Sequence, residues 1–148
     1  MVLSAEMYKS YFQEELPDGR RVGLEMEYPV VTTGNGFGQF DLSAFLRTLA
    51  EEGAWERFHD DIRPDLLTGL RDSEGRVVTT DAGVALLELV LPPRKSLIEV
   101  EKKDGAFLKR IRERIAQAGG AVLGYGMHPS AAAKNPIWVR RGRYDFLH

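Results

Sequence analysis

The sequence contains no cysteine, no long apolar run and almost no net charge. Without cysteine, disulfide bonds and thiolate metal sites are excluded. The 20 basic and 22 acidic residues give a formal charge of -2, which provides no general attraction for nucleic acid or an anionic membrane. No segment approaches the length of a membrane span, and the N-terminal residues lack the apolar stretch of a signal peptide. We therefore expect a cytoplasmic protein with neither nucleic acid nor membrane as a partner.

The remaining composition is that of an ordinary globular domain. Apolar residues make up 43% and charged residues 28% of the chain, so it can bury a core and has no bias toward disorder. There is no internal repeat and no convincing domain boundary. The length of 148 residues is consistent with a single domain over residues 1–148.

Local patterns predict several strands with helices between groups of them. Apolar residues follow Ser4 at helical spacing, and residues 21–31 alternate as in a strand. Further strands are expected at 66–71, 76–80, 84–91 (closed by Pro92 and Pro93) and 121–127, with a hairpin turn at 72–75. Helices are expected after Asp41 or Ser43 and, with a capping box, after Ser96. This order predicts an α+β fold with a largely antiparallel sheet and helices packed on one face.

Four carboxylates stand out from these patterns. Glu88 lies within an otherwise apolar strand, so it must be protonated, paired with a cation or directed toward a polar cavity. Glu25 and Glu27 share one side of their strand, about 6.5 to 7 Å apart. Simpler explanations exist: a basic partner in the sheet for Glu88, a solvated face for Glu25 and Glu27, and a turn for Asp81.

The joint pattern of these carboxylates favours a metal site. If the two strands are neighbours with their acidic sides aligned, three or four carboxylates converge and raise one another's pKa values unless cations compensate. Mg²⁺ prefers oxygen ligands and leaves positions for water and phosphate. The residues therefore suggest a magnesium–nucleotide site on one side of the sheet.

Four motifs, in order, resemble the glutamate–cysteine ligase family. Residues 23–27 (Gly-Leu-Glu-Met-Glu) are similar to the family's first-strand motif, and residues 79–88 (Thr-Thr-Asp to Leu-Leu-Glu) to its second acidic strand. Residues 123–129 and 142–145 (Gly-Arg-Tyr-Asp) are similar to later stretches of the plant and proteobacterial branch. One such motif is weak, but four in the family's order are fairly specific.

This resemblance implies a fold, an activity and a set of site residues. The fold would be a curved antiparallel sheet, half of a glutamine synthetase/guanido kinase-like fold. The activity would be an ATP- and magnesium-dependent ligation, in which the γ-carboxylate of glutamate is phosphorylated and then attacked by the amine of cysteine or another amine. The metal-associated positions would be Glu25, Glu27, Asp81 and Glu88, and those near the substrate or nucleotide Arg143 and Tyr144. No catalytic residue is assigned.

The sequence also departs from the family pattern. Family members continue well beyond the Gly-Arg-Tyr-Asp stretch, whereas this chain stops at His148. Residues 85–87 (Ala-Leu-Leu) also replace the polar residues of the plant motif. We therefore expect an incomplete catalytic domain, with a non-catalytic binding or regulatory module as the alternative. The open edge of such a sheet would favour self-association.

Three further segments give weaker signals. The glycine-rich residues 34–38 lack the lysine of a phosphate-binding loop, so a flexible loop or a flap is favoured. His59, Asp60 and Asp61 are a possible metal cluster, but adjacent residues on an irregular segment more often form a solvated surface. His128 before Pro129 is as readily structural as functional. No Ser/His/Asp arrangement indicates a hydrolase.

Overall fold

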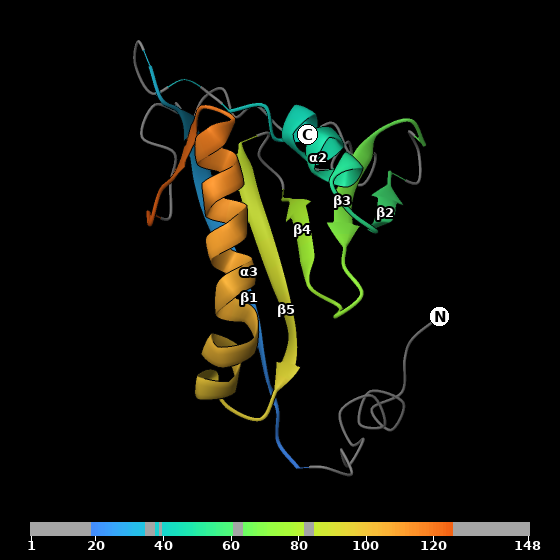
Figure 1. Ribbon diagram of the computed structural model, residues 1–148, viewed down its shortest axis with the longest axis vertical. Coiled ribbons are helices and arrows are strands. Elements are labelled where there is room, and N and C mark those ends of the chain that lie inside the picture. The colour runs from blue at the N-terminus through green and yellow to red at the C-terminus, as the bar shows by residue number, and fades with distance from the viewer. Residues whose placement is uncertain (1–18, 35–37, 39, 61–63, 82–84, 126–148) are drawn as a thin grey trace, which may run out of the picture.

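In the described part of the computed structural model, a six-stranded antiparallel sheet carries two helices on one face (Figure 1). The structure describes residues 19–34, 38, 40–60, 64–81 and 85–125. Its elements are β1 (Val22–Thr32), α2 (Leu42–Glu51), β2 (Glu56–His59), β3 (Leu67–Arg71), β4 (Val77–Thr80), β5 (Leu86–Arg94), α3 (Leu97–Gln117) and β6 (Gly120–Val122). The strand order is β2-β3-β4-β5-β1-β6, which confirms the predicted α+β class.

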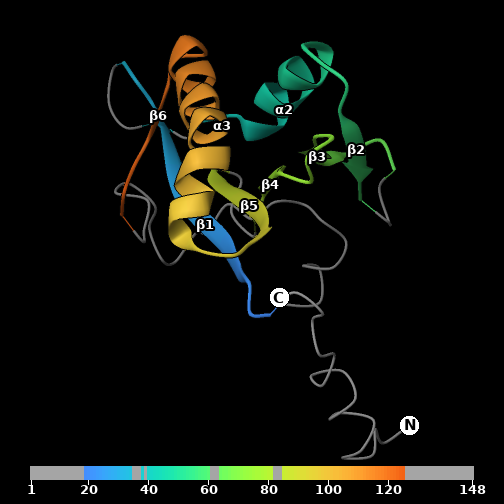
Figure 2. The same ribbon diagram turned by 60° about the horizontal axis from the view of Figure 1, so that its bottom comes forward.

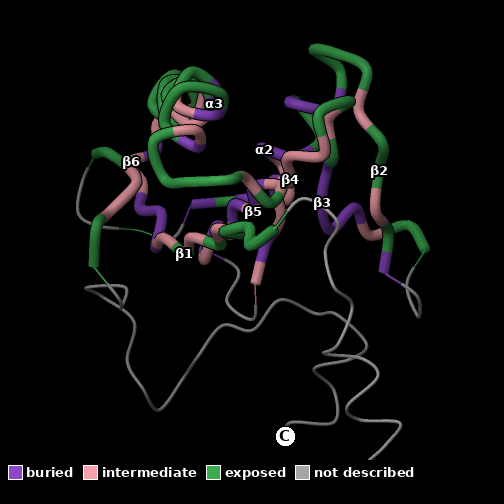
Figure 3. The backbone as a smooth tube through the Cα atoms, turned by 90° about the horizontal axis from the view of Figure 1, so that it is seen from below, coloured by how far each residue is buried: buried purple, intermediate pink, exposed green. Residues whose placement is uncertain are grey.

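Both helices lie on the same side of the sheet, as Figures 2 and 3 show. The core fills the space between them and the strands. It is built from the apolar stripes of the helices and from the inward residues of the strands, and its fully buried members include Leu42, Leu46, Leu70, Val78, Leu87, Leu91, Ile111 and Ile115. The period of two along each strand sends the intervening residues to the opposite, helix-free side of the described sheet.

Capping side chains define where both helices begin. Asp41 is the N-cap of α2, and its Oδ1 accepts a hydrogen bond of 2.9 Å from the backbone N–H of Ala44. The Oγ of Ser96 accepts from Glu99 N at 3.2 Å, and the Glu99 carboxylate accepts from Lys95 N at 2.9 Å. In a standard capping box this second bond comes from the backbone N–H of the N-cap residue, whereas here it comes from Lys95, the residue before the N-cap Ser96. The predicted capping box is therefore present in a slightly extended form.

Two predictions about the strands are wrong. His59, read as part of an irregular segment, is the last residue of strand β2, which the sequence did not predict; residues 56–59 form it because they pair with β3, although their own sequence carries little strand signal. Strand β5 does not end before Pro92 but continues through Pro93 to Arg94. The prolines are tolerated there because β4 pairs with β5 only as far as Val90, and the β1–β5 register shifts beside them.

Some predictions concern the edge strands of the sheet or residues outside the described ranges. Strand β6 is described only for Gly120–Val122, although a further ladder bond joins Leu123 N to the oxygen of Pro29. The predicted helix after Ser4 lies outside the described residues. Strands β2 and β6 form the edges of the described sheet, and self-association through an edge remains a prediction.

Candidate functional site

The helix-free side of the sheet carries two rows of residues that cross five strands in register. We call these ten residues the acid face. One row consists of Glu25, Val90, Val77, Arg71 and Glu56, and the other of Glu27, Glu88, Thr79, Gly69 and Phe58. Directly paired residues of neighbouring strands share a side of the sheet, so all ten side-chain positions belong to one surface.

The alternation within β1 and β5 explains why the glutamates lie there. Leu24 and Met26 pack against the core from β1, while Glu25 and Glu27 are exposed. In β5 the neighbours of Glu88 on both sides along the chain are buried leucines, and Glu88 itself is half-buried. The apolar residues thus direct the carboxylates away from the helices.

Glu27 and Glu88 lie directly opposite each other on neighbouring strands. Directly opposed residues have Cβ atoms about 4.5 to 5.5 Å apart, and like charges at this separation destabilise a sheet. A cation between the two carboxylates would reverse the sign of that effect. Glu88 also takes part in a further interaction within the chain.

Asp81 extends the same surface beyond the end of β4. Its backbone N–H donates to Leu86 O at 3.1 Å, which continues the β4–β5 ladder by one step. The alternation of the strand therefore places Asp81 on the side of Thr79 and Glu88. Asp81 is half-buried and, like Glu88, has a further interaction in the chain.

The acid face fits magnesium by the chemistry of its donors. Within the described part of the chain, no group of three or more His, Cys, Asp or Glu side chains is arranged to hold a metal ion. Mg²⁺, however, is usually bound through one or two carboxylates, with water and substrate phosphates in the remaining positions. The opposed pair Glu27 and Glu88 meets that requirement, with Glu25 two residues along β1 from Glu27.

Other predicted site residues lie elsewhere. Arg143, Tyr144 and His128 are outside the described residues, as is Asp61. His59 is exposed on the edge strand β2, and the neighbouring Asp60 is buried.

A cavity of about 520 Å³ lies on the helix side of the sheet, between α2 and the last turn of α3. Its lining includes Phe40, Phe45 and the ion pair of Glu52 with Arg114, whose N···O distance is 2.9 Å. None of the described residues of the four family motifs lines it. We therefore assign the candidate site to the acid face rather than to this cavity.

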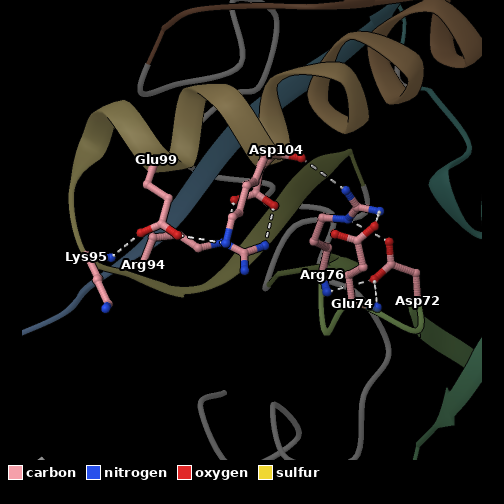
Figure 4. Close-up of polar contacts among 8 residues, drawn as sticks. Asp72, Glu74, Arg76, Arg94, Lys95, Glu99 and Asp104 are labelled. Carbon is pink, nitrogen blue, oxygen red and sulfur yellow. Dashed lines mark hydrogen bonds and ion pairs between the residues drawn. The ribbon is translucent and has the colours of Figure 1, made fainter. Parts of the chain in front are cut away.

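An ion pair between Arg94 and Asp104 joins the end of β5 to α3 on the helix side of the sheet. Arg94 Nη2 donates to Asp104 Oδ1 at 2.7 Å and Arg94 Nε to Oδ2 at 3.0 Å (Figure 4). The hydrogen bond to Asp104 raises the pKa of Arg94. Sequence reasoning missed this pair, although Asp104 lies between Val100 and Phe107 on the apolar stripe of α3, where a carboxylate signals a buried partner.

None of the helices in the described part of the chain is both long and apolar enough to span a membrane.

Comparisons with known proteins identify the family. The comparison with curated proteins returns no match. The family model for glutamate–cysteine ligase family 2 matches residues 21–148, a range that contains the acid face and all four motifs. Since the match covers most of the sequence, the chain belongs to glutamate–cysteine ligase family 2.

Proposed function

We propose that the acid face binds magnesium and ATP for a ligation that joins a carboxylate to an amine. Family membership supports a ligase activity of the carboxylate–amine type. The observation that carries the assignment of the site is the direct pairing of Glu27 with Glu88 on the helix-free side of the described sheet. Use of ATP favours a cytoplasmic site of action.

Four carboxylates of this surface have a proposed role in metal binding. Glu27 and Glu88 would provide oxygen ligands for magnesium, and Glu25 and Asp81 would bind through water. Bound magnesium would neutralise negative charge on the phosphates of ATP. The apolar residues behind β1 and β5 hold these carboxylates on rigid strands, which limits the reorganisation that substrate binding requires.

The proposed reaction has two steps. The γ-phosphoryl group of ATP passes to an oxygen of the substrate carboxylate, which gives an acyl phosphate and ADP. The amine then attacks the acyl carbon, an amide bond forms and phosphate leaves. Glutamate as the carboxylate and cysteine or another amine as the nucleophile are proposed from the family, with Arg143 and Tyr144 as substrate contacts.

Titration calorimetry with Mg²⁺ and a non-hydrolysable ATP analogue tests the site. We expect saturable binding by the wild-type chain, weakened by about 10-fold or more in Glu27→Gln and Glu88→Gln, since each change removes a charged ligand. Glu27 is the cleaner substitution because its side chain is exposed. Glu101→Gln, an exposed glutamate of α3, provides the matched control.

The outcome separates the two candidate functions. Binding that depends on Glu27 and Glu88 supports a working metal–nucleotide surface. A folded wild-type chain that binds neither magnesium nor the analogue would reject the proposal and leave the non-catalytic binding or regulatory module.

A further inference from the structure

The acid face carries a cation as well as carboxylates. The row that starts at Glu25 passes through Val90 and Val77 and reaches Arg71 on β3. Among the ten residues of the acid face, Arg71 is the one with a positive charge. A single surface of the described sheet thus presents negative charge on β1 and β5 and positive charge on β3.

Arg71 is oriented by two neighbours from strand β2. Its Nη1 lies 3.1 Å from the Oε2 of Glu56, and its Cζ lies 4.6 Å from the centre of the Phe58 ring. The arginine side chain nevertheless remains 45% exposed. A guanidinium has five N–H donors, so the contact with Glu56 leaves it able to bind a second oxyanion. Stacking on Phe58 limits the freedom that such binding would remove.

The spacing between Arg71 and the carboxylates suits an extended ligand. Standard strand dimensions place the Cα atoms of Arg71 and Glu88, two strands and two residues apart, about 12 Å from each other. Both side chains rise from the same surface, so one small molecule can contact them together. The half-buried Val77 and Val90 lie between the two charges and offer it an apolar floor.

The ion pair of Arg71 with Glu56 is not explained by a contribution to the stability of the fold. The Glu56 side chain is 59% exposed, and an ion pair this open to solvent contributes little to the folded state. The position of Arg71 is more informative, because Arg71 lies in the row of Glu25, next to the row that holds the proposed magnesium ligands Glu27 and Glu88.

We propose that Arg71 binds an oxyanion, a carboxylate or a phosphate, of the substrate whose metal-associated part lies at Glu27 and Glu88. This inference rests on the proposed function and adds a second anchoring point to the same site. Glu56 holds the guanidinium when substrate is absent and competes with the incoming oxyanion for it. Removing the charge of Glu56 therefore has an effect opposite to that of removing Arg71.

Calorimetric titrations of Arg71→Gln and Glu56→Gln with two probes test the proposal. The probes are Mg²⁺ with a non-hydrolysable ATP analogue, and L-glutamate added in their presence. We expect Arg71→Gln to weaken one probe by about 10-fold or more, as for loss of one charge-assisted hydrogen bond. We expect Glu56→Gln to tighten the same probe by up to about 5-fold, the factor of an exposed ion pair. The affected probe identifies the oxyanion as phosphate or carboxylate.

Arg110→Gln is the matched control. Arg110 also lies over an aromatic ring, that of Trp55 at 5.9 Å, but belongs to α3 on the helix side of the sheet. We expect its affinity for both probes to equal that of wild type. Arg71→Lys, which keeps the charge without the planar fork, should bind with intermediate affinity and replaces Arg71→Gln if that variant does not fold.

The results distinguish failure of the inference from failure of the proposed function. Wild-type binding with unchanged affinities in Arg71→Gln would overturn the role of Arg71 and leave the metal–nucleotide proposal intact. A wild-type chain that binds neither probe would overturn both.

Discussion

Replacing Asp104 by asparagine should destabilise the fold strongly, although Asp104 belongs to α3 on the helix side of the sheet and is no part of the acid face. Its side chain is completely buried, and both carboxylate oxygens accept hydrogen bonds from Arg94, whose side chain is only 15% exposed. Loss of one member of a buried pair typically costs about 3 to 5 kcal/mol, because the other charge is left without compensation. The residual exposure of Arg94 and the remaining amide oxygen favour the lower end, about 3 kcal/mol.

Urea and thermal unfolding measure this effect directly. A loss of about 3 kcal/mol corresponds to a fall in Tm of roughly 6 to 12 °C for a chain of this size. Glu113→Gln is the control, because its pair with Lys109 spans 3.8 Å with side chains 59% and 77% exposed. It should change the free energy of unfolding by less than about 0.5 kcal/mol.

Two results would refute the reasoning. One is an unfolding free energy for Asp104→Asn within about 1 kcal/mol of wild type, since surface pairs behave in that way. The other is a failure of the double substitution Arg94→Met with Asp104→Leu to recover most of the lost stability, because a well-packed apolar replacement removes both buried charges.

The pair also makes a prediction about pH. The hydrogen bond to Asp104 raises the pKa of Arg94 in the folded state. A raised pKa contributes stability that is complete below the unfolded pKa and is lost only as the pH rises through the folded one. Because arginine titrates far above neutrality, the stability contributed by the charge on Arg94 should not fall between neutral and mildly alkaline pH, as urea unfolding at each pH would show.

Three smaller perturbations test other parts of the fold by urea unfolding. Gly105→Ala should stabilise by about 0.5 to 1 kcal/mol, because Gly105 is inside α3 and an added Cβ meets no atom within 4 Å; a loss of stability would contradict this. Gly69→Ala should destabilise by about 1 to 3 kcal/mol, because its Cβ would lie 2.9 Å from Thr79 side-chain atoms; unchanged stability would argue against that close approach. A hydrogen bond from Lys103, followed by one from the backbone N–H of Lys95, lowers the pKa of Glu99. The stability that ionised Glu99 contributes is therefore fully present above the ordinary glutamate pKa and is lost as the pH falls through the lowered pKa of the folded state. Glu99→Gln should flatten the acid limb of the stability profile, and an unchanged limb would exclude this role.

Much of the local structure follows from short-range patterns in the chain. Asp41 and Ser96 can cap helices wherever they precede a suitable apolar stripe, because a cap needs only the backbone N–H groups of the next turn. The alternation around Glu25 and Glu27 likewise predicts a strand with one acidic side. These features depend on residues within one or two turns or strand repeats, so they could be predicted without the fold.

Elements that depend on distant partners could not be predicted in this way. Residues 56–59 form a strand only because β3 provides the hydrogen bonds of the ladder. Pro92 and Pro93 are accommodated in β5 because β4 no longer pairs there. In both cases the local sequence favours another conformation, and tertiary pairing overrides it.

The candidate site likewise combines features that local sequence predicts with features that depend on distant parts of the chain. The sequence by itself determined which residues carry charge, that Glu25 and Glu27 share a side of one strand, and that Glu88 interrupts an apolar strand. Only the tertiary structure decided that β1 lies beside β5, which sets Glu27 opposite Glu88, and that Arg71 falls in the neighbouring row, that of Glu25. The physical reason is that strand order and register depend on how the buried faces pack against the helices, a long-range requirement that the period of a single strand does not contain.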